Sequence, residues 1–315
     1  MAQRNVRQSA RPNSAERITE RPNPRSRALD TRSTIEILRI INSEDRKVAR
    51  AVARVIPQIA RAVDLAGEAL ARGGRLVYLG AGTSGRLGVL DAAECLPTFG
   101  TEQVVGVMAG APDSMFRPTE VSEDEPRLAE RDLRRIRFSR SDILVAITAS
   151  GRTPYAIGGL RHARRLRAST VLVTSNADAP ASRLASVTIA PVTGPEVITG
   201  STRMKAGTAQ KLVLNMISTA AMVRQGRVFS NLMVCIQLSN AKLRKRGERI
   251  FIEITGARAP QARKILGAAG NRLPVALLMY SAGVTRQEAE KLLESGASPA
   301  KLLREGRSRH SMTVT

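Results

Sequence analysis

The stretch LVYLGAGTSGRLGVLDAAECLPTFG, residues 76–100, decides the fold class of this chain. An apolar run, LVYLG, leads into a glycine-rich turn with two hydroxyl side chains, and a helical segment follows. A strand that is apolar at consecutive positions and precedes a helix is typical of a parallel sheet covered on both faces. Ligands of such sheets bind beyond the carboxyl ends of the strands, so we expect the turn at 80–86 to lie in a binding site.

The same alternation of apolar strands and helical segments continues along the chain. Further strands are expected at 103–110, 142–150, 169–177 and 186–192. The sequence therefore predicts an α/β fold with a parallel five-stranded sheet flanked by helices. A long apolar helix from about Ala206 to Arg224 should be buried, either in its own core or against a second subunit.

The two ends of the chain differ from this central pattern. Helices are expected from about Thr34 to Asn42 and from Asp45 to a stop at Gly73, with a kink at Pro57. Near the C-terminus, Thr285 begins a capping box and short amphipathic helices follow one another. We divide the chain into a disordered basic arm, N-terminal helices that pack on the core, an α/β domain that contains the sheet, a small helical C-terminal domain and a tail: 1–15, 16–74, 75–256, 257–306 and 307–315.

The composition restricts the classes of function. A net charge of +23 is spread over the whole chain and aromatic residues make up only 3%, which favours a surface that attracts anionic substrates over one that binds nucleic acid. Neither a membrane-spanning run nor a secretory signal is evident, so we expect a cytoplasmic protein without membrane contact. With only two cysteines, Cys95 and Cys235, and two histidines, no cluster has metal-ligand spacing.

Residues 80–86, GAGTSGR, have the character of a phosphate site. Glycines let backbone N–H groups approach a ligand, and Thr83 and Ser84 add hydroxyl donors just before a helix N-terminus. Gly80, Gly82 and Gly85 also have the dinucleotide-binding spacing, but the next strand ends in MAG without the acidic residue that would hold a ribose. We therefore favour a monophosphate over a dinucleotide.

A second loop, TASGRTP at 148–154, presents the same chemistry at the end of another strand. Thr148, Ser150 and Thr153 carry hydroxyls, and Gly151 leaves the backbone open. Two hydroxyl-rich loops that face one crevice would form a phosphate cup without a metal. Some of these side chains could instead cap the helices that follow, and the two roles are compatible.

Three long motifs closely resemble the N-acetylmuramic acid 6-phosphate etherases, members of the sugar isomerase (SIS) domain superfamily. They are GAGTSGRLGVLDAAECLPTFG, TASGRTPYAIGGL and GPEVITGSTRMKAGTAQKLVLNMIST. The resemblance runs from TERPNPRSRALDTRSTIEIL, near Thr19, into the helical C-terminal region. The related glucokinase regulatory protein shares much of the pattern but has two SIS domains, and this chain has room for one.

The resemblance implies a lyase that removes D-lactate from N-acetylmuramic acid 6-phosphate, leaving N-acetylglucosamine 6-phosphate, in the catabolism of a peptidoglycan sugar. It also implies a homodimer with sites near the subunit interface and no metal or organic cofactor. An ether is a poor leaving group, so the chemistry would use the open-chain aldehyde. Its carbonyl acidifies the C2 proton, a base removes that proton, the lactyl oxygen departs from C3 as an acid protonates it, and water then adds. One or two carboxyl groups suited to acid and base roles are required.

Two glutamates match the catalytic residues of the family. Glu94, in DAAEC, matches the acid/base glutamate, and Glu120, in RPTEVSED, matches the second one. The helix that begins at the phosphate loop is expected to carry Glu94 toward C2 and C3. Residues 123–125 are also acidic, and a solvated acidic stretch would look the same, so the choice of Glu120 among them rests on the family motif alone.

Three more charged residues follow in GPEVITGSTRMK. Glu196 lies in the loop where SIS-domain aldose–ketose isomerases place an active-site glutamate, which suggests a role in ring opening or in holding a sugar hydroxyl. Arg203 and Lys205 are candidates for the site of the lactyl carboxylate, or equally for capping and surface roles. Two other functions stay open: an amino-sugar-phosphate isomerase that relies on Glu196, and a non-catalytic module that senses sugar phosphates.

Overall fold

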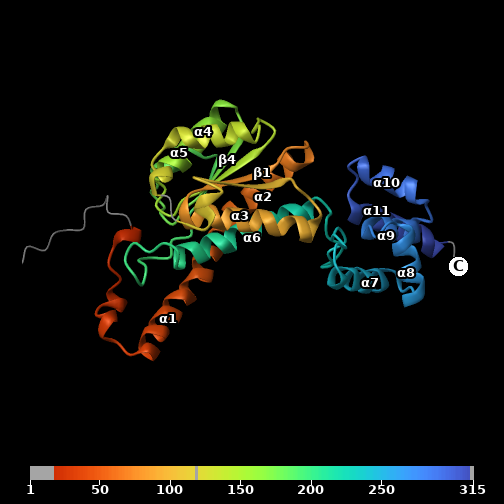
Figure 1. The fold of residues 1–315 in the computed structure, drawn as a ribbon, viewed down its shortest axis with the longest axis horizontal. Helices are drawn as coiled ribbons and strands as arrows, with labels where there is room; N and C mark the ends of the chain where they lie inside the picture. The colour runs from red at the N-terminus through yellow and green to blue at the C-terminus, as the bar shows by residue number, and fades with distance from the viewer. Residues whose placement is uncertain (1–17, 118–119, 313–315) are drawn as a thin grey trace, which may run out of the picture.

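A computed structural model of the protein describes residues 18–117 and 120–312, with backbone alone at 120–121 and 306–312. Within them, five strands form one parallel sheet in the order β2-β1-β3-β4-β5. The strands are β1 (Leu76–Gly80), β2 (Val104–Met108), β3 (Ile143–Ile147), β4 (Ser169–Val173) and β5 (Val187–Ile189). Each lies within a segment expected from the sequence, and the predicted α/β fold with a parallel five-stranded sheet is confirmed (Figure 1).

Helices cover both faces of the sheet. One face packs against α2 (Ile56–Ala71), α3 (Gly82–Phe99) and α6 (Lys205–Arg224), and the other against α4 (Pro126–Arg135) and α5 (Pro154–Arg165) (Figure 1). Along β1, Leu76 and Tyr78 enter the first core, whereas Val77 and Leu79 enter the second. Because both faces are buried, the strands read as uninterrupted apolar runs rather than as alternating patterns.

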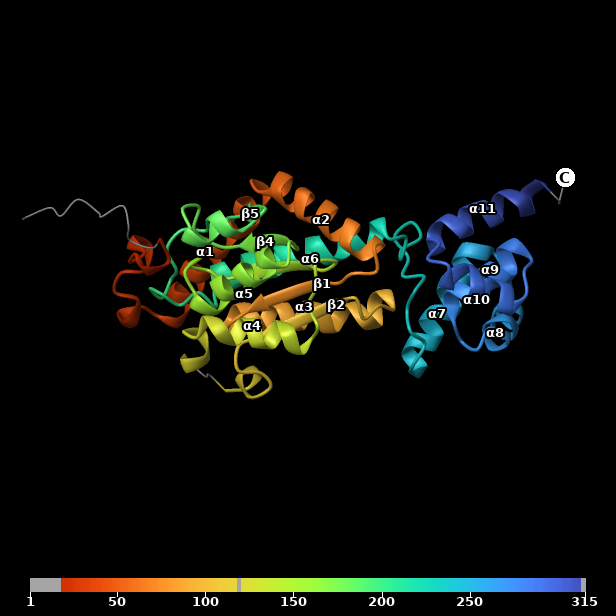
Figure 2. The ribbon, with the colours of Figure 1, turned by 90° about the horizontal axis from the view of Figure 1, so that it is seen from above.

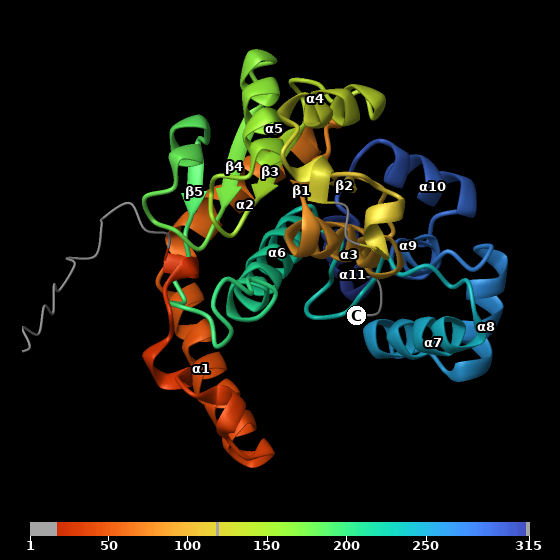
Figure 3. The ribbon, with the colours of Figure 1, turned by 60° about the vertical axis from the view of Figure 1, so that its left-hand side comes forward.

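The N-terminal region precedes the sheet as three short 3-10 turns and a long helix. The turns are η1 (Ile18–Glu20), η2 (Pro24–Ser26) and η3 (Leu29–Thr31), and the helix is α1 (Thr34–Ala53). A capping box of Ser33 and Glu36 starts α1. The sequence suggested a helix end near Asn42, but α1 continues to Ala53, because only Pro57, which lacks an N–H donor, requires a new first turn. Figure 3 shows the first turns of α1 projecting from the body of the molecule.

The C-terminal helices have a core of their own. They are α7 (Ala241–Thr255), α8 (Ala259–Ala268), α9 (Leu273–Ala282), α10 (Arg286–Glu294) and α11 (Pro299–Met312), and Figure 2 shows them beside one end of the sheet domain. Phe251 and Ile254 of α7 are buried in this core together with Val234, so the unit begins well before residue 257, where the sequence suggested it. Likewise α11 extends past 306, where a tail was expected. The arm at 1–15 lies outside the described residues.

Candidate functional site

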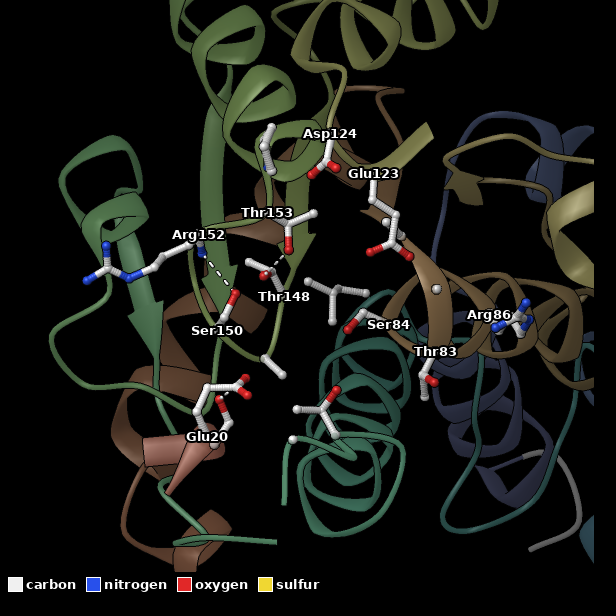
Figure 4. Close-up of a pocket in the computed structure, with 18 residues that line it drawn as sticks. Glu20, Thr83, Ser84, Arg86, Glu123, Asp124, Thr148, Ser150, Arg152 and Thr153 are labelled. Atoms are coloured by element: carbon white, nitrogen blue, oxygen red, sulfur yellow. Dashed lines mark hydrogen bonds between the residues drawn. The ribbon is translucent and has the colours of Figure 1, made fainter. Parts of the chain in front are cut away.

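The pocket of interest lies where the strand order of the sheet reverses, between β1 and β3. Gly80 and Ile147 are register partners at the ends of these strands, so the loops that follow them lie side by side. Such a switch point is where open parallel sheets bind ligands. A pocket of about 480 Å³ occupies this position, and both hydroxyl-rich loops line it (Figure 4).

The N-terminus of α3 forms one wall of the pocket. Gly82, Thr83 and Ser84 make up its first turn and line the cavity, as the sequence predicted. The N-cap residue, Ala81, has a methyl side chain, which cannot accept a hydrogen bond from the N–H groups of this turn. The first N–H groups of a helix have no intrahelical partner and lie at the positive end of its dipole, so this wall is suited to a phosphate.

The loop after β3 supplies the facing hydroxyls. Thr148, Ser150 and Thr153 all line the pocket, and the hydroxyls of the two threonines are 2.8 Å apart. Ser150 Oγ accepts a hydrogen bond from Arg152 N at 3.2 Å, which leaves its own proton available to a ligand. Gly151 does not line the pocket but shapes the loop. Its φ is +68°, and a Cβ there would lie 2.2 Å from a neighbouring Cβ, so only glycine fits.

Three carboxylates border this hydroxyl cup. Glu123 and Asp124 come from the turn η5 (Glu120–Glu123) and the residue after it, and Glu20 comes from η1. A Cβ added at Gly82 would lie 2.8 Å from Glu123 Oε1, so this carboxylate rests against the N-terminus of α3. Glu20 enters from the other side of the cavity, beside Ser150 (Figure 4).

Sequence reasoning missed Glu20 and named Glu123 only as a neighbour of Glu120. The signals were present: Glu20 belongs to the TERPNP stretch of the family resemblance, and Glu123 to the acidic run after Pro118. Neither signal could be resolved further, because the segments meet only in the folded chain. Thr19 O accepts a hydrogen bond from Gly200 N at 3.0 Å, a contact between residues far apart in the sequence.

Neither of the two predicted catalytic glutamates, Glu94 and Glu120, is among the described side chains that line the pocket. Glu94 is exposed on α3 and does not line the pocket. It follows Gly82 by twelve residues, which corresponds to roughly 18 Å along the helix axis. In the single chain the helix therefore carries Glu94 away from the pocket. The sequence had suggested the opposite, that the helix carries Glu94 toward the substrate. Glu120 begins η5, but its side chain lies outside the described residues, so its role stays a prediction.

Glu196 and Lys205 support the pocket from behind rather than lining it. Glu196 is 1% exposed, and its two oxygens accept hydrogen bonds from the backbone N–H groups of Lys205 at 3.0 Å and Ala206 at 2.8 Å, so it caps α6. Burial raises the pKa of Glu196, and these two hydrogen bonds oppose the rise. Arg203 is exposed and also lies outside the pocket lining. Substrate contacts of these three residues stay predictions.

The ammonium group of Lys205 is held in a buried ion pair. Lys205 and Glu44 are each 1% exposed, and Lys205 Nζ lies 2.6 Å from Glu44 Oε2 and 3.1 Å from Thr193 O. Burial alone would raise the pKa of Glu44, but hydrogen bonds from Lys205, Lys47 and Asn23 lower it to about 2. Asn23 Nδ2 also donates to Pro195 O at 3.1 Å, so this pair connects the N-terminal region to the loop behind the pocket.

Two arginines belong to the pocket wall. Arg86 donates to the backbone carbonyls of Ser114 at 2.6 Å and Met115 at 3.0 Å, and so holds the turn η4 (Asp113–Met115) against α3. Arg152 is exposed at the rim. Within the described residues, no group of three or more His, Cys, Asp and Glu side chains could hold a metal ion, and no helix has the length and apolar character to cross a membrane. The pocket thus combines a helix N-terminus and hydroxyl groups, which suit an anion, with carboxylates.

The chain is similar in sequence to proteins of known families. The model of the glucokinase regulatory protein N-terminal SIS domain matches residues 58–164, and that of the SIS domain matches residues 123–220. The chain is 52% identical over 279 residues to an N-acetylmuramic acid 6-phosphate etherase of Edwardsiella ictaluri, covering 88% of this chain and 93% of that protein. It is 48% identical to one of Clostridium botulinum, with coverages of 88% and 92%. A phosphoheptose isomerase structure from Neisseria gonorrhoeae superposes with a TM-score of 0.47 at 17% identity, covering 59% of this chain and 97% of the other.

Proposed function

The chain belongs to the N-acetylmuramic acid 6-phosphate etherases, and we propose that it cleaves the lactyl ether of N-acetylmuramic acid 6-phosphate in the pocket between β1 and β3. The products are N-acetylglucosamine 6-phosphate and D-lactate, which makes the protein a carbon–oxygen lyase. One observation carries the proposal: the carboxylate of Glu123 rests against the N-terminus of a helix whose first turn forms half of a hydroxyl cup. An anion site and an acid/base group are therefore within the length of one sugar.

The phosphate would occupy the cup. The N–H groups at the start of α3, together with the hydroxyls of Thr83, Ser84 and Ser150, supply the donors that a phosphate dianion requires. The sugar chain would then extend across the cavity between Glu123 and Glu20. Because the phosphate does not react, its role is to hold C2 and C3 in a fixed position relative to the carboxylates.

Elimination needs a base for the C2 proton and an acid for the departing lactyl oxygen. Glu123 lies at the cup, with its carboxyl group against the N-terminus of α3, so we assign it as the acid that protonates the oxygen leaving C3. After the C2–H and C3–O bonds break, the product is an unsaturated aldehyde and free lactate. Water then adds its hydroxyl at C3 and gives a proton to the carboxylate that served as the acid, while the base returns its proton to C2, so both groups regain their starting states.

The base would come from a second subunit. Glu94 lies on the same side of α3 as Leu90, one turn away, and the large apolar side chains of Leu90, Met216 and Val223 are 43%, 40% and 47% exposed on α3 and α6. An apolar face of this kind is suited to a homodimer interface. We propose that dimerisation covers this face and brings Glu94 of each subunit to the pocket of its partner.

The central test compares two glutamate-to-glutamine substitutions. Glu123→Gln removes the proton donor at the pocket, whereas Glu125→Gln, two residues on, changes an exposed residue outside it. We expect Glu123→Gln to lower kcat for D-lactate release by about a hundredfold or more and Glu125→Gln to keep it within about twofold. Near-native turnover by folded Glu123→Gln would rule out this acid and leave the cup without its assigned chemistry.

Subunit mixing tests the role of Glu94. If Glu94 serves the partner's pocket, a heterodimer of Glu94→Gln and Glu123→Gln subunits has one site with both changes and one with neither. Random exchange of the two inactive variants should then restore about a quarter of native activity. No recovery, although co-purification of subunits that carry different affinity tags shows that mixed dimers form, would place Glu94 in its own subunit's site or outside catalysis. A native chain that is monomeric would exclude the arrangement.

The wider setting follows from the substrate. N-acetylmuramic acid is a peptidoglycan sugar, so we place the reaction in amino sugar catabolism during peptidoglycan recycling. We infer a cytoplasmic location because the substrate is a phosphorylated metabolite, and the two unpaired thiols, Cys95 and Cys235, fit a reducing compartment. The isomerase alternative gains no support from Glu196, whose oxygens are taken up by backbone donors. Tight binding of the sugar phosphate without turnover would favour the sensing module.

A further inference from the structure

Ser84, one of the hydroxyl residues of the cup, is bonded to a buried glutamine on another helix. Its Oγ lies 3.0 Å from Gln210 Oε1, and the two side chains are 9% and 1% exposed. Gln210 belongs to α6, and Gly207 of the same helix lies so close to the cup that a Cβ there would be 3.5 Å from Thr83 Cγ2. Gln210 does not line the pocket, so it can affect a ligand only through Ser84.

The hydrogen-bonding groups of Ser84 and Gln210 are not all satisfied by described residues in the observed arrangement. Serine has one proton to donate, and in the observed arrangement that proton is directed to Gln210 Oε1. The amide nitrogen of Gln210 is buried and has no hydrogen-bond partner among the described residues. A phosphate dianion only accepts hydrogen bonds, so Ser84 cannot donate to Gln210 and to a phosphate at the same time.

A half-turn of the Gln210 side-chain amide, which exchanges its oxygen and nitrogen, frees the Ser84 proton for the phosphate. Gln210 Nε2 then donates to a lone pair of Ser84 Oγ, and the serine proton is free to point to the phosphate. This orientation gives the buried Nε2 an acceptor, and Oε1 moves to the position that Nε2 occupies in the observed one. A side chain that alternates between accepting and donating in this way can set the direction of the hydroxyl.

We propose that Gln210 is a positioning residue for the substrate phosphate: its amide donates to Ser84 and so fixes the Ser84 hydroxyl as a donor to the phosphate. This rests on the proposed function, since it takes the cup as the phosphate site. The phosphate is bound equally before and during the reaction, so the contribution of Gln210 appears in KM and not in kcat. A residue that only held α3 and α6 together would not change KM while leaving kcat unchanged.

A double-mutant cycle tests the pair. Ser84→Ala, Gln210→Met and the double variant are compared with the native chain by calorimetric binding of N-acetylglucosamine 6-phosphate and by KM and kcat for D-lactate release. Methionine matches glutamine in length without offering a donor or an acceptor. Gln225→Leu removes an amide from the other end of α6, where it bonds to Gly67 O at 2.9 Å, and serves as the control. Thermal unfolding verifies that each variant is folded.

We expect Ser84→Ala to weaken binding about tenfold and Gln210→Met about fivefold, with kcat unchanged. In the Ser84→Ala background, Gln210→Met should have no further effect, and the Gln225→Leu control should bind like the native chain. Equal losses in both backgrounds, tighter binding by Gln210→Met, or no effect of Gln210→Met would each overturn the proposal. If Ser84→Ala itself leaves binding unchanged, Ser84 is not a phosphate donor and this proposal fails, whereas the proposed function fails only if the native chain releases no D-lactate.

A second variant covers the case in which Gln210→Met does not fold. Gln210→Glu keeps the shape but can only accept when ionised, so it retains the serine proton and adds negative charge near the phosphate. Binding of N-acetylglucosamine 6-phosphate should then be weaker than in Ser84→Ala. Native affinity in Gln210→Glu would show that the direction of the Ser84 hydroxyl does not depend on this position.

Discussion

Replacing Glu44 by glutamine would test how the pocket is held together. In the native chain this carboxylate, on α1, accepts hydrogen bonds from Lys205 Nζ at 2.6 Å, from Asn23 Nδ2 at 3.0 Å and from Lys47. Glutamine keeps one acceptor oxygen but loses the charge. The buried ammonium of Lys205 would then lose its anionic partner and keep only neutral acceptors of those observed, such as the carbonyl of Thr193.

Two independent estimates give the magnitude. The pKa of Glu44 falls from 4.5 to about 2 on folding, and at 1.36 kcal/mol per pKa unit the ionised carboxylate stabilises the fold by about 3 kcal/mol. Removing one partner of a buried ion pair generally costs about 3–5 kcal/mol, because the other charge stays buried. We therefore expect Glu44→Gln to lower the free energy of unfolding at pH 7 by about 3 kcal/mol.

The pH dependence gives a second, sharper expectation. A carboxyl group whose pKa is depressed by folding contributes its full stabilisation above the unfolded value of 4.5 and loses it as the pH falls toward about 2. The stability difference between the native chain and Glu44→Gln should be constant from pH 7 to about 5 and then shrink.

Urea unfolding followed by circular dichroism, at a series of pH values, measures both quantities. Glu68→Gln is the matched control, because Glu68 is 63% exposed and lies 3.8 Å from Arg72, and exposed pairs contribute about 0–1 kcal/mol. A Glu44→Gln chain within about 1 kcal/mol of native at pH 7 would refute the reasoning. So would a difference that does not change between pH 5 and the onset of acid unfolding.

Three other outcomes follow from the same contacts. Gly151→Ala would place a Cβ at φ +68° and 2.2 Å from a neighbouring atom, whereas in the control Gly73→Ala φ is +77° but nothing lies within 4 Å. Calorimetry should therefore show a larger loss of stability in Gly151→Ala than in Gly73→Ala. Equal losses would contradict the clash. Glu196→Gln should destabilise the fold by about 1 kcal/mol through the weakened cap of α6 and keep kcat within about twofold, whereas a large loss of kcat would give Glu196 the substrate role suggested by the sequence. Burial raises the pKa of Cys95 to about 12 and also raises that of Cys235, so iodoacetamide at pH 8 should alkylate neither thiol until urea unfolds the chain, as mass spectrometry would show; rapid native labelling would mean that a thiol is accessible.

The position of the two hydroxyl-rich loops in the pocket could be predicted from the sequence. Thr83 and Ser84, and Thr148, Ser150 and Thr153 in the second loop, were expected to form a phosphate cup, and all of them line the pocket. The reason is that each group directly follows a strand, and parallel strands end at a common edge of the sheet. Local order along the chain was therefore enough to bring two loops together.

The carboxylates were harder to assign because they reach the pocket from segments without such a rule. Glu20 comes from a short turn near the N-terminus, and Glu123 from an acidic run in which the neighbours have the same chemistry. Motif position favoured Glu94, but a helix rises about 1.5 Å per residue and takes that side chain away from the cup. Whether Glu94 reaches the pocket of a partner subunit depends on how two chains pack together.

The sequence by itself determined the order of strands and helices along the chain and the position of two hydroxyl-rich loops at strand ends, because apolar runs, glycines and hydroxyls act over a few neighbouring residues. Only the tertiary structure decided which acidic side chains face those loops and that Glu44 and Lys205 meet in the interior. That pairing joins residues far apart along the chain, and burial turns an ordinary surface pair of charges into one that the fold depends on. Local patterns carry no record of such long-range contacts, which arise when the helices close over the sheet.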